Sequence, residues 1–379
     1  MTARIAAAYE VPYTRHPSPN SSTERLLAQA ARGVVSEAGM EPGSVDGLGV
    51  SSFSLQPDHA IDLAWRLGLH LNWIMEDPHG GASGLNLLQH AVRAVEAGDA
   101  RNILLLAGDH LDSAAFTRLA RAYNRATAES LAPLGYHGPN PLFAMLTQRH
   151  MRAHDLDETD YAQVPLAQRG WARRNPHAVY RTPMTLADYL QAPMVAPPLR
   201  RYDCVPVVSG ANALLVTSDE ILEGHAVRVR ATVSSFNHDN QQQDGLSTGL
   251  QLVAHRLWER AGLGPNDIDL ACVYDDYPVM VLTQLTDLGV VEPSELQRFL
   301  HERVGTRRWP LNTSGGQLST GQAGAAGGMH GLVEATRQLV GRADRRQVPS
   351  ARHALVTGYG MVAYRHGACA NAAILEGVG

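Results

Sequence analysis

The sequence of 379 residues contains no lysine, because all 32 residues counted as lysine or arginine are arginines. A Schiff-base aldolase or a pyridoxal-phosphate enzyme forms its covalent intermediate on a lysine amine, so this chain cannot supply the nucleophile of either class. Cysteine is scarce as well. The three present, Cys204, Cys272 and Cys369, form no CxxC pair, which excludes a disulfide framework and a zinc ribbon within the chain.

Long apolar runs and strong charge are also missing. No segment reaches the roughly 18 uninterrupted apolar residues of a membrane-spanning helix. The N-terminus has no signal-peptide core and favours a first strand, so we expect a cytoplasmic protein. A net charge of -5 provides no basic field for nucleic acid. His150 and His154 have the spacing of helical metal ligands, but no third ligand is near them in the sequence, so we expect no metal site.

One sequence pattern occurs twice. Ala-Gly-x-x-Pro-x-x-x-Asp spans residues 38–46 and again 261–269. Each copy follows an amphipathic helix, predicted at 23–38 and at about 249–261, because glycine and proline end the helix at that point. Each copy also precedes a short apolar strand. The chain therefore contains an internal duplication.

A second pair of segments supports the duplication. Glycine-rich turns at 80–84 and 321–328 each open a helix, and each helix leads to an apolar strand, at 102–108 and 353–358. Strand, helix, strand alternation predicts an α/β fold with mostly parallel sheets. Both turns bring backbone N–H groups and the positive end of a helix dipole toward one site. An acyl thioester oxygen or a phosphate would suit such a site.

The duplication suggests two related halves. We expect an N-terminal half at 1–219 and a C-terminal half at 220–379. The segment at about 110–199 is richer in arginine, proline and tyrosine and is predicted to be an inserted loop domain over the pocket. Arginine clusters such as the one at 118–125 are expected to be solvated faces, or to meet the phosphates of a ligand.

Four further motifs, in this order, resemble those of the thiolase superfamily, and within it the lipid-transfer-protein or sterol-carrier-type thiolases. They lie at 171–178, 197–200, 209–213 and 312–316, where Asn-Thr-Ser-Gly-Gly is similar to the family's Asn-x-x-Gly-Gly turn. The resemblance covers essentially the whole chain. It implies the thiolase fold, with five layers αβαβα built from two duplicated halves that carry mixed, mostly parallel sheets.

The catalytic residues of a thiolase are absent from the matching positions. Gly81 stands where the family has its nucleophilic cysteine, and Gln322 stands where its Gly-His-Pro motif has the histidine. No cysteine occurs at 356–361, where the second catalytic cysteine would lie. Glycine cannot form an acyl-enzyme, and glutamine cannot accept a proton near neutral pH. Claisen chemistry through an acyl-cysteine is therefore not expected.

Tyrosines occupy key positions instead. Tyr274 takes the first position of the turn that helps to form the family's oxyanion hole, and Tyr359 lies at the turn expected to face the pocket. The resemblance to steroid side-chain aldolases of the same branch implies retro-aldol cleavage of a 3-hydroxyacyl-CoA. Coenzyme A would be part of the substrate, with no other cofactor bound. Packing alone is the alternative role for both tyrosines.

The candidate residues fall into two groups. The catalytic candidates, with Asp276 as an alternative proton carrier, are Tyr274, Tyr359, Asp275, Gln322 and His366. The substrate-binding candidates are Gly81, Ser83, His79, Asn312, Gly315 and Gly316. Turn or cap roles are the alternative for the two aspartates. His330 is expected to be buried against the sheet.

Two other functions stay open at this point. The lost nucleophile also fits a non-catalytic acyl-CoA or lipid-binding subunit, or an acyltransferase that uses no acyl-enzyme. The resemblance implies a homodimer that buries an edge strand, and a possible OB-fold partner subunit with a zinc ribbon. An unpaired strand edge would otherwise invite aggregation.

Overall fold

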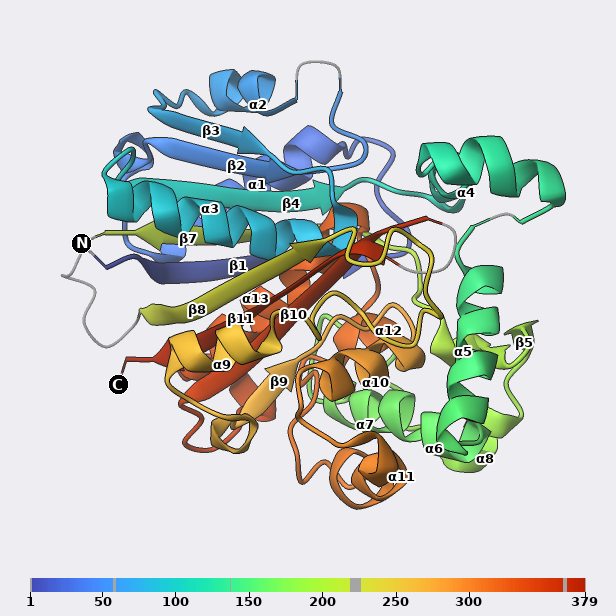
Figure 1. Cartoon of the computed structure of the whole chain (residues 1–379). Helices are drawn as coiled ribbons and strands as arrows, with labels where there is room; N and C mark the ends of the chain where they lie inside the picture. Colours follow the sequence, from blue (N-terminus) through green and yellow to red (C-terminus); the bar gives the residue numbers. More distant parts are fainter. Residues whose placement is uncertain (1, 57–58, 137, 219–225, 364–366, 379) are drawn as a thin grey trace.

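A computed structural model describes residues 2–56, 59–136, 138–218, 226–363 and 367–378. Within them, nine strands form one sheet in the order β3-β2-β4-β7-β1-β8-β11-β10-β9 (Figure 1). The strands are β1 (Arg4–Thr14), β2 (Gly47–Ser51), β3 (Trp73–Glu76), β4 (Asn102–Asp109), β7 (Ser209–Thr217), β8 (Val227–Phe236), β9 (Leu270–Cys272), β10 (His353–Val362) and β11 (Gly367–Gly377). A hairpin of β5 (Met194–Ala196) and β6 (Leu199–Arg200) stands apart from this sheet.

The helices form two groups. Those that pack on the sheet are α1 (Thr23–Glu37), α2 (His59–Leu67), α3 (Ser83–Ala97), α9 (Ala254–Ala261), α10 (Pro278–Asp287) and α13 (Gly327–Leu339). Those between β4 and β7 are α4 (Ser113–Arg121), α5 (Asn140–His154), α6 (Glu158–Tyr161), α7 (Gln163–Ala172) and α8 (Leu186–Leu190). Two short helices, α11 (Leu296–Phe299) and α12 (Gly316–Thr320), lie between α10 and α13.

The order of elements repeats. The series β1, α1, β2, α2, β3, α3, β4, β7 matches the series β8, α9, β9, α10, α13, β10, β11. A parallel bridge between Ala271 and Leu311 stands in the second series where β3 stands in the first. The structure therefore contains the duplicated topology that the sequence pattern predicts. The predicted boundary at 219/220 falls in 219–225, outside the described residues.

The prediction of a mixed sheet is confirmed, but the prediction that its strands are mostly parallel is wrong. Among the pairings of the nine strands, three are parallel and five are antiparallel. Helical crossovers join β2 to β3, β2 to β4 and β9 to β10, and these three pairs are the parallel ones. The strands β1, β7, β8 and β11 pair with one another and with β4 and β10 without such a crossover, and all of these pairs are antiparallel.

Three hydrophobic clusters hold the helices to the sheet. One contains Leu27 of α1 and Leu63 of α2. A second contains Leu88 of α3 and Leu332 of α13 together with strand residues from both halves. A third contains Leu257 of α9 and residues of α10. The three clusters follow the predicted order of layers, with helices on the outside and α3 and α13 between the two halves of the sheet. The strands, however, form one continuous sheet and not the two sheets of the predicted five-layer fold.

The central helices α3 and α13 begin beside each other. A Cβ atom on Gly84 would lie 2.1 Å from the carbonyl oxygen of Gly328, and one on Gly328 would lie 2.7 Å from that of Gly80. Only glycine permits this approach of two backbones. Both glycine turns therefore meet at one place, which is where the candidate site lies.

Candidate active site

A cavity of about 110 Å³ lies where the two glycine turns, α4 and the C-terminal end of β10 meet. Its polar lining includes Tyr123, Tyr274, Asp276, Gln322 and Tyr359. Its apolar lining includes Phe53, Phe116, Leu119, Leu142 and Val362. A mostly apolar cavity with a few convergent polar groups is the usual form of a small-molecule site. We call it the pocket below.

Gly81 and Tyr274 fit against each other at the base of the pocket. A Cβ atom on Gly81 would lie 2.2 Å from Cζ of Tyr274 and 2.2 Å from the carbonyl oxygen of Tyr359. The ring of Tyr274 therefore fills the space into which a side chain at position 81 would project. Tyr274 can occupy this position only because residue 81 has no side chain, so the two residues depend on each other.

The phenol of Tyr274 is held from several sides. Its oxygen accepts a hydrogen bond of 2.9 Å from the amide nitrogen of Gln322, which leaves the phenol proton free to be donated. Its backbone N–H donates to Thr357, and its carbonyl oxygen accepts from Gln284. Burial raises the pKa of Tyr274 well above its ordinary value. The phenol is thus a fixed neutral donor.

Gln322 orients this tyrosine. Its Nε2 donates to Tyr274 and, over 3.2 Å, to Oε1 of Gln317, so both amide hydrogens are engaged. Backbone hydrogen bonds with Pro206 and Val208 fix the loop that carries it. Gln322 lines the pocket, and both of its amide donors bind protein groups.

Two more tyrosines face the pocket. The phenol oxygen of Tyr359 accepts a hydrogen bond from the backbone N–H of Gly367. Tyr123 follows α4, and burial raises its pKa to about 12. Sequence reasoning missed Tyr123, because the surrounding arginines at 118–125 suggested a solvated face. Its position in the pocket depends on how the segment after α4 folds back, and no local motif encodes that.

The two neighbouring aspartates differ in environment. Asp275 accepts from the backbone N–H groups of Gln317 and Leu318 at the start of α12, and burial raises its pKa to about 6. Asp276 lines the pocket, and its Oδ1 has no hydrogen-bond partner within the described structure. Burial, followed by the charge of Asp275, raises the pKa of Asp276 to about 8. Asp276 is therefore the carboxyl group that faces the pocket.

The remaining predicted residues lie around the pocket. His79 and Ser83 both bind Oδ1 of Asp77, at 2.9 and 2.6 Å, and this interaction fixes the first glycine turn. Asn312 pairs with both backbone groups of Val273. None of these three side chains lines the pocket.

The glycines at 315 and 316 adopt positive φ angles, 108° and 60°. A Cβ atom on Gly316 would lie 2.1 Å from Oδ2 of Asp275, so this glycine permits the contact between α12 and the aspartate. Gly315 packs against Ala172 in the same way. His366 lies outside the described residues.

The described part of the chain contains neither a cluster of metal ligands nor a membrane-spanning helix. No three His, Cys, Asp or Glu side chains gather there as a metal site would need. No helix there has the length and apolar character to cross a membrane.

Comparisons with known proteins agree with this geometry. A family described as "Thiolase C-terminal domain-like" matches residues 231–372. The chain is 31% identical over 358 residues to a 17-hydroxy-3-oxo-4-pregnene-20-carboxyl-CoA lyase of Mycobacterium tuberculosis, covering 88% of this chain and 90% of the relative. It is 29% identical to a steroid side-chain-cleaving aldolase of Thermomonospora curvata, covering 84% of this chain and 85% of the relative.

A solved structure described as an Ltp2-ChsH2(DUF35) aldolase superposes with a TM-score of 0.85 at 25% identity, covering 100% of this chain and 98% of that one. The duplicated α/β topology and the paired glycine turns define a thiolase-like protein. The chain belongs to the thiolase superfamily, in the lipid-transfer and sterol-carrier-type branch that resembles steroid side-chain aldolases. The predicted family is confirmed.

Proposed function

We propose that the protein is a carbon-carbon lyase that cleaves a 3-hydroxyacyl-CoA by a retro-aldol reaction without an acyl-enzyme. The observation that carries the proposal is the fit of Tyr274 into the space above Gly81, beside the carboxyl group of Asp276, whose Oδ1 has no hydrogen-bond partner within the described residues. The arrangement replaces a nucleophile with a hydrogen-bond donor and an acid/base group. The similarity to a carboxyl-CoA lyase and to a steroid side-chain-cleaving aldolase supports the reaction class.

The reaction begins when the carboxylate of Asp276 accepts the proton of the substrate's 3-hydroxyl group. The C3–O bond becomes a carbonyl, the C2–C3 bond breaks, and its electron pair moves into an enolate whose charge develops on the thioester oxygen. Protonation at C2 then gives the shorter acyl-CoA. A pKa of about 8 lets Asp276 take and return protons near neutral pH.

The tyrosines stabilise the enolate. Tyr274 and Tyr359 each accept a hydrogen bond from the protein, so each can direct its own proton toward the thioester oxygen. Donors fixed in advance cost no reorganisation during the reaction. Loss of one such donor typically lowers kcat by a factor of about 10²–10³. In this scheme Gln322 acts by orienting Tyr274.

The protein must bind two parts of the substrate, the acyl group and coenzyme A. Phe53, Phe116 and Leu119 give the acyl group an apolar wall. Arginine is the only strong cation on this chain, so the phosphates of coenzyme A would meet arginines. We propose that the acyl group is apolar.

We also propose a partner subunit. The similar Ltp2-ChsH2(DUF35) aldolase structure includes a DUF35 component, and the resemblance in sequence implies an OB-fold subunit with a zinc ribbon. A homodimer through β3 is proposed as well, because β3 is an edge strand of the sheet.

The test is incubation of the purified chain, alone and with the DUF35-type protein encoded nearest to it, with a series of 3-hydroxyacyl-CoA thioesters. Release of a ketone or aldehyde and a shortened acyl-CoA supports the lyase. Tight binding of the thioester with no cleavage under either condition would instead support a non-catalytic binding subunit. An intact protein mass increased by an acyl group would reveal a nucleophile and contradict the proposal.

A further inference from the structure

The loop that follows β2 contributes an aromatic side chain, Phe53, to the wall of the pocket. Phe53 lies seven residues beyond the first copy of the repeated pattern, which ends at Asp46. Asp276 lies seven residues beyond the second copy, which ends at Asp269. Phe53 and Asp276 are therefore equivalent positions of the two halves, and both line the pocket. The second half supplies a carboxyl group there, and the first half supplies a ring that restricts the space.

The ring of Phe53 meets that of Tyr123 above the first glycine turn. A Cβ atom on Gly80 would lie 3.1 Å from Cζ of Phe53 and 2.7 Å from the phenol oxygen of Tyr123. The ring centroids are 5.7 Å apart and the ring planes are inclined by 68°, which is the edge-to-face packing that aromatic pairs favour. Gly80 precedes Gly81, against which Tyr274 packs, so the aromatic pair borders the pocket next to the proposed reacting groups.

The space left inside these walls is small. The pocket has a volume of about 110 Å³. For comparison, an engineered apolar cavity of about 150 Å³ binds benzene, and pockets for drug-sized ligands measure about 300–1,000 Å³. An acyl group of about the size of one ring therefore fits, whereas a fused-ring skeleton does not fit unless the wall is displaced.

A buried carboxyl group fixes the loop that carries Phe53. Asp109, at the end of β4, is 0% exposed. Its Oδ1 accepts hydrogen bonds of 2.8 Å from the backbone N–H groups of Phe53 and Ser54. The same oxygen accepts hydrogen bonds of 2.7 and 2.6 Å from the hydroxyl groups of Ser52 and Ser54. Its Oδ2 accepts one of 2.8 Å from the backbone N–H of Ala325, so Asp109 links the aromatic wall to the second glycine turn.

We propose that Phe53 is a specificity-determining residue that limits the acyl group to about the size of a single ring, and that Asp109 positions Phe53 for this task. That the ligand is a CoA thioester rests on the proposed function. Phe53 limits size through its own volume, whereas Asp109 acts only through the loop that carries Phe53. The protein then accepts compact apolar thioesters and rejects polycyclic ones, because a rigid fused-ring skeleton competes with the Phe53 ring for the same space.

Two substitutions at position 109 separate positioning from general stability. Asp109→Ala removes the acceptor from both the loop and the turn. Asp109→Asn keeps one carbonyl oxygen, which can still accept from the four donors of the loop, while its amide end no longer accepts from Ala325. Asp109→Asn should therefore restore most of the selectivity that Asp109→Ala loses.

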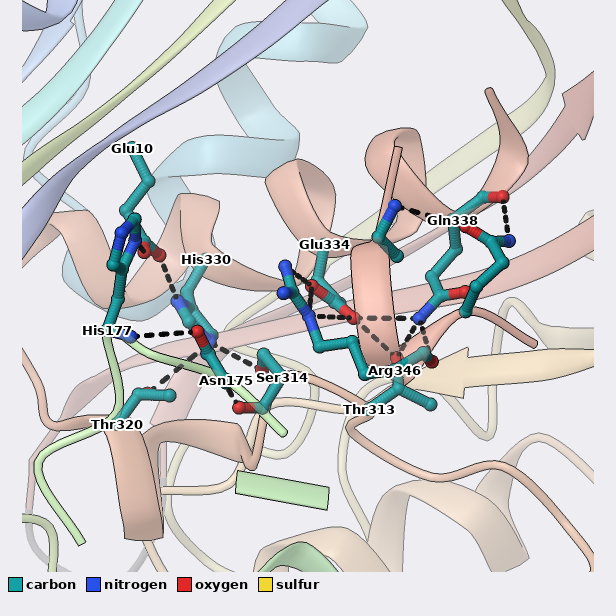
Figure 2. A network of polar contacts seen from close by, with 12 residues as sticks. Glu10, Asn175, His177, Thr313, Ser314, Thr320, His330, Glu334, Gln338 and Arg346 are labelled. Atoms are coloured by element: carbon teal, nitrogen blue, oxygen red, sulfur yellow. Dashed lines mark hydrogen bonds and ion pairs between the residues drawn. The ribbon is translucent and has the colours of Figure 1, made fainter. Parts of the chain in front are cut away.

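Helix α13 offers a matched control for the loss of a buried carboxyl group. Glu334 forms a buried ion pair of 2.9 Å with Arg346 and also accepts hydrogen bonds from Thr313 and Gln338 (Figure 2). Glu334 does not line the pocket. Glu334→Ala thus lowers stability in a similar way and leaves the aromatic wall in place.

The experiment measures the binding of two thioesters to the full chain by isothermal titration calorimetry. Butyryl-CoA has a compact acyl group, and 3-oxo-4-pregnene-20-carboxyl-CoA has a fused four-ring one. Neither has the hydroxyl group that a retro-aldol reaction requires, so binding is measured without cleavage. In the natural chain butyryl-CoA should bind more tightly by about 10-fold or more, because overfilling a packed site is unfavourable by at least that factor.

Phe53→Ala should reduce this ratio of the two Kd values by about 10-fold, because loss of the ring extends the pocket. Phe236→Ala is its control, since Phe236 is 53% exposed and does not line the pocket. Asp109→Ala should change the ratio in the same direction as Phe53→Ala, and Glu334→Ala should leave it unchanged. If Asp109→Ala does not fold, the double variant Ser52→Ala, Ser54→Ala decides, because it removes two of the four hydrogen bonds of the loop.

A natural chain that binds the four-ring thioester as tightly as butyryl-CoA would overturn the proposal, as would an unchanged ratio in folded Phe53→Ala. An unchanged ratio in folded Asp109→Ala, or in the double serine variant, would overturn the role of Asp109. Selective binding together with failure to cleave any 3-hydroxyacyl-CoA would refute the proposed function and leave the size limit intact. No binding of either thioester to the natural chain would overturn both.

Discussion

At the scale of single residues, the unusual feature of this protein is a substitution that fills space. In a thiolase-like frame, glycine at position 81 removes the nucleophile, and the ring of Tyr274 occupies the volume that glycine leaves. The reactive groups that remain are Asp276 and the phenols of Tyr123, Tyr274 and Tyr359. None of them is a strong nucleophile when buried and neutral, and together they suit proton transfer and enolate stabilisation.

Asp276→Asn tests the proposed base. The variant keeps the shape of the side chain but cannot accept the hydroxyl proton, so we expect kcat/KM to fall by about 10²–10⁴. In the natural chain kcat/KM should rise with pH and level off above the pKa of about 8. The variant should lose this rise. A pH-rate profile of Asp276→Asn that still bends near 8 would assign the base elsewhere.

The same residue predicts how stability depends on pH. The pKa of Asp276 is about 8 in the folded chain and 3.8 in its ordinary state, so between these values only the folded state holds the proton. Stability from this group therefore falls as pH rises from about 4 to 8.

At pH 8, Asp276→Asn should be more stable than the natural chain by about 1–3 kcal/mol, because a buried charge with one unpaired oxygen is removed. Urea unfolding at pH 6 and pH 8 measures this difference. The gain should shrink at the lower pH; an equal effect at both values would argue against a shifted carboxyl group.

At the scale of elements, the site depends on two helices that start in contact. The approach of Gly84 to the carbonyl oxygen of Gly328 leaves no room for a methyl group. Gly84→Ala should therefore destabilise the chain by about 1–3 kcal/mol and reduce thioester binding, since both glycine turns must shift. Gly43→Ala is the control, because a Cβ atom there meets nothing within 4 Å. Thermal unfolding of the two variants makes the comparison.

The sequence predicted these elements better than it predicted the sheet. Glycine and proline mark the ends of α1 and α9 in both copies of the repeated pattern, so the helices and the following strands could be placed. The antiparallel pairing of β7 and β11 could not be predicted, because no local sequence pattern shows in which direction two distant strands pair. For the same reason Tyr123 was missed, and Asp275 was preferred to Asp276 although only Asp276 lines the pocket.

At the scale of the whole molecule, the chain is a thiolase-like frame whose pocket no longer contains a cysteine. Cys204, Cys272 and Cys369 all lie outside the lining of the pocket. Burial also raises the pKa of all three thiols. Within the described residues, therefore, no thiolate is available to replace the one lost at position 81.

The proposed dimer is a prediction at this scale. Ile74 of the edge strand β3 is 44% exposed, and Ile61 and Trp65 of the adjacent α2 are 63% and 77% exposed. A second copy pairing along β3 would cover these side chains. Ile74→Arg should then shift the chain from dimer to monomer in light scattering. A natural chain that is already monomeric at the concentrations of the assay would contradict the proposed dimer.

Cleavage in D₂O tests the central claim most directly. A retro-aldol reaction forms an enolate, so the released acyl-CoA should carry one solvent deuterium at C2, while the protein gains no acyl group at any time during the reaction. Tyr274→Phe should slow this cleavage by about 10²-fold without changing the labelling. An acylated protein during turnover, or cleavage that places no deuterium at C2, would contradict the account.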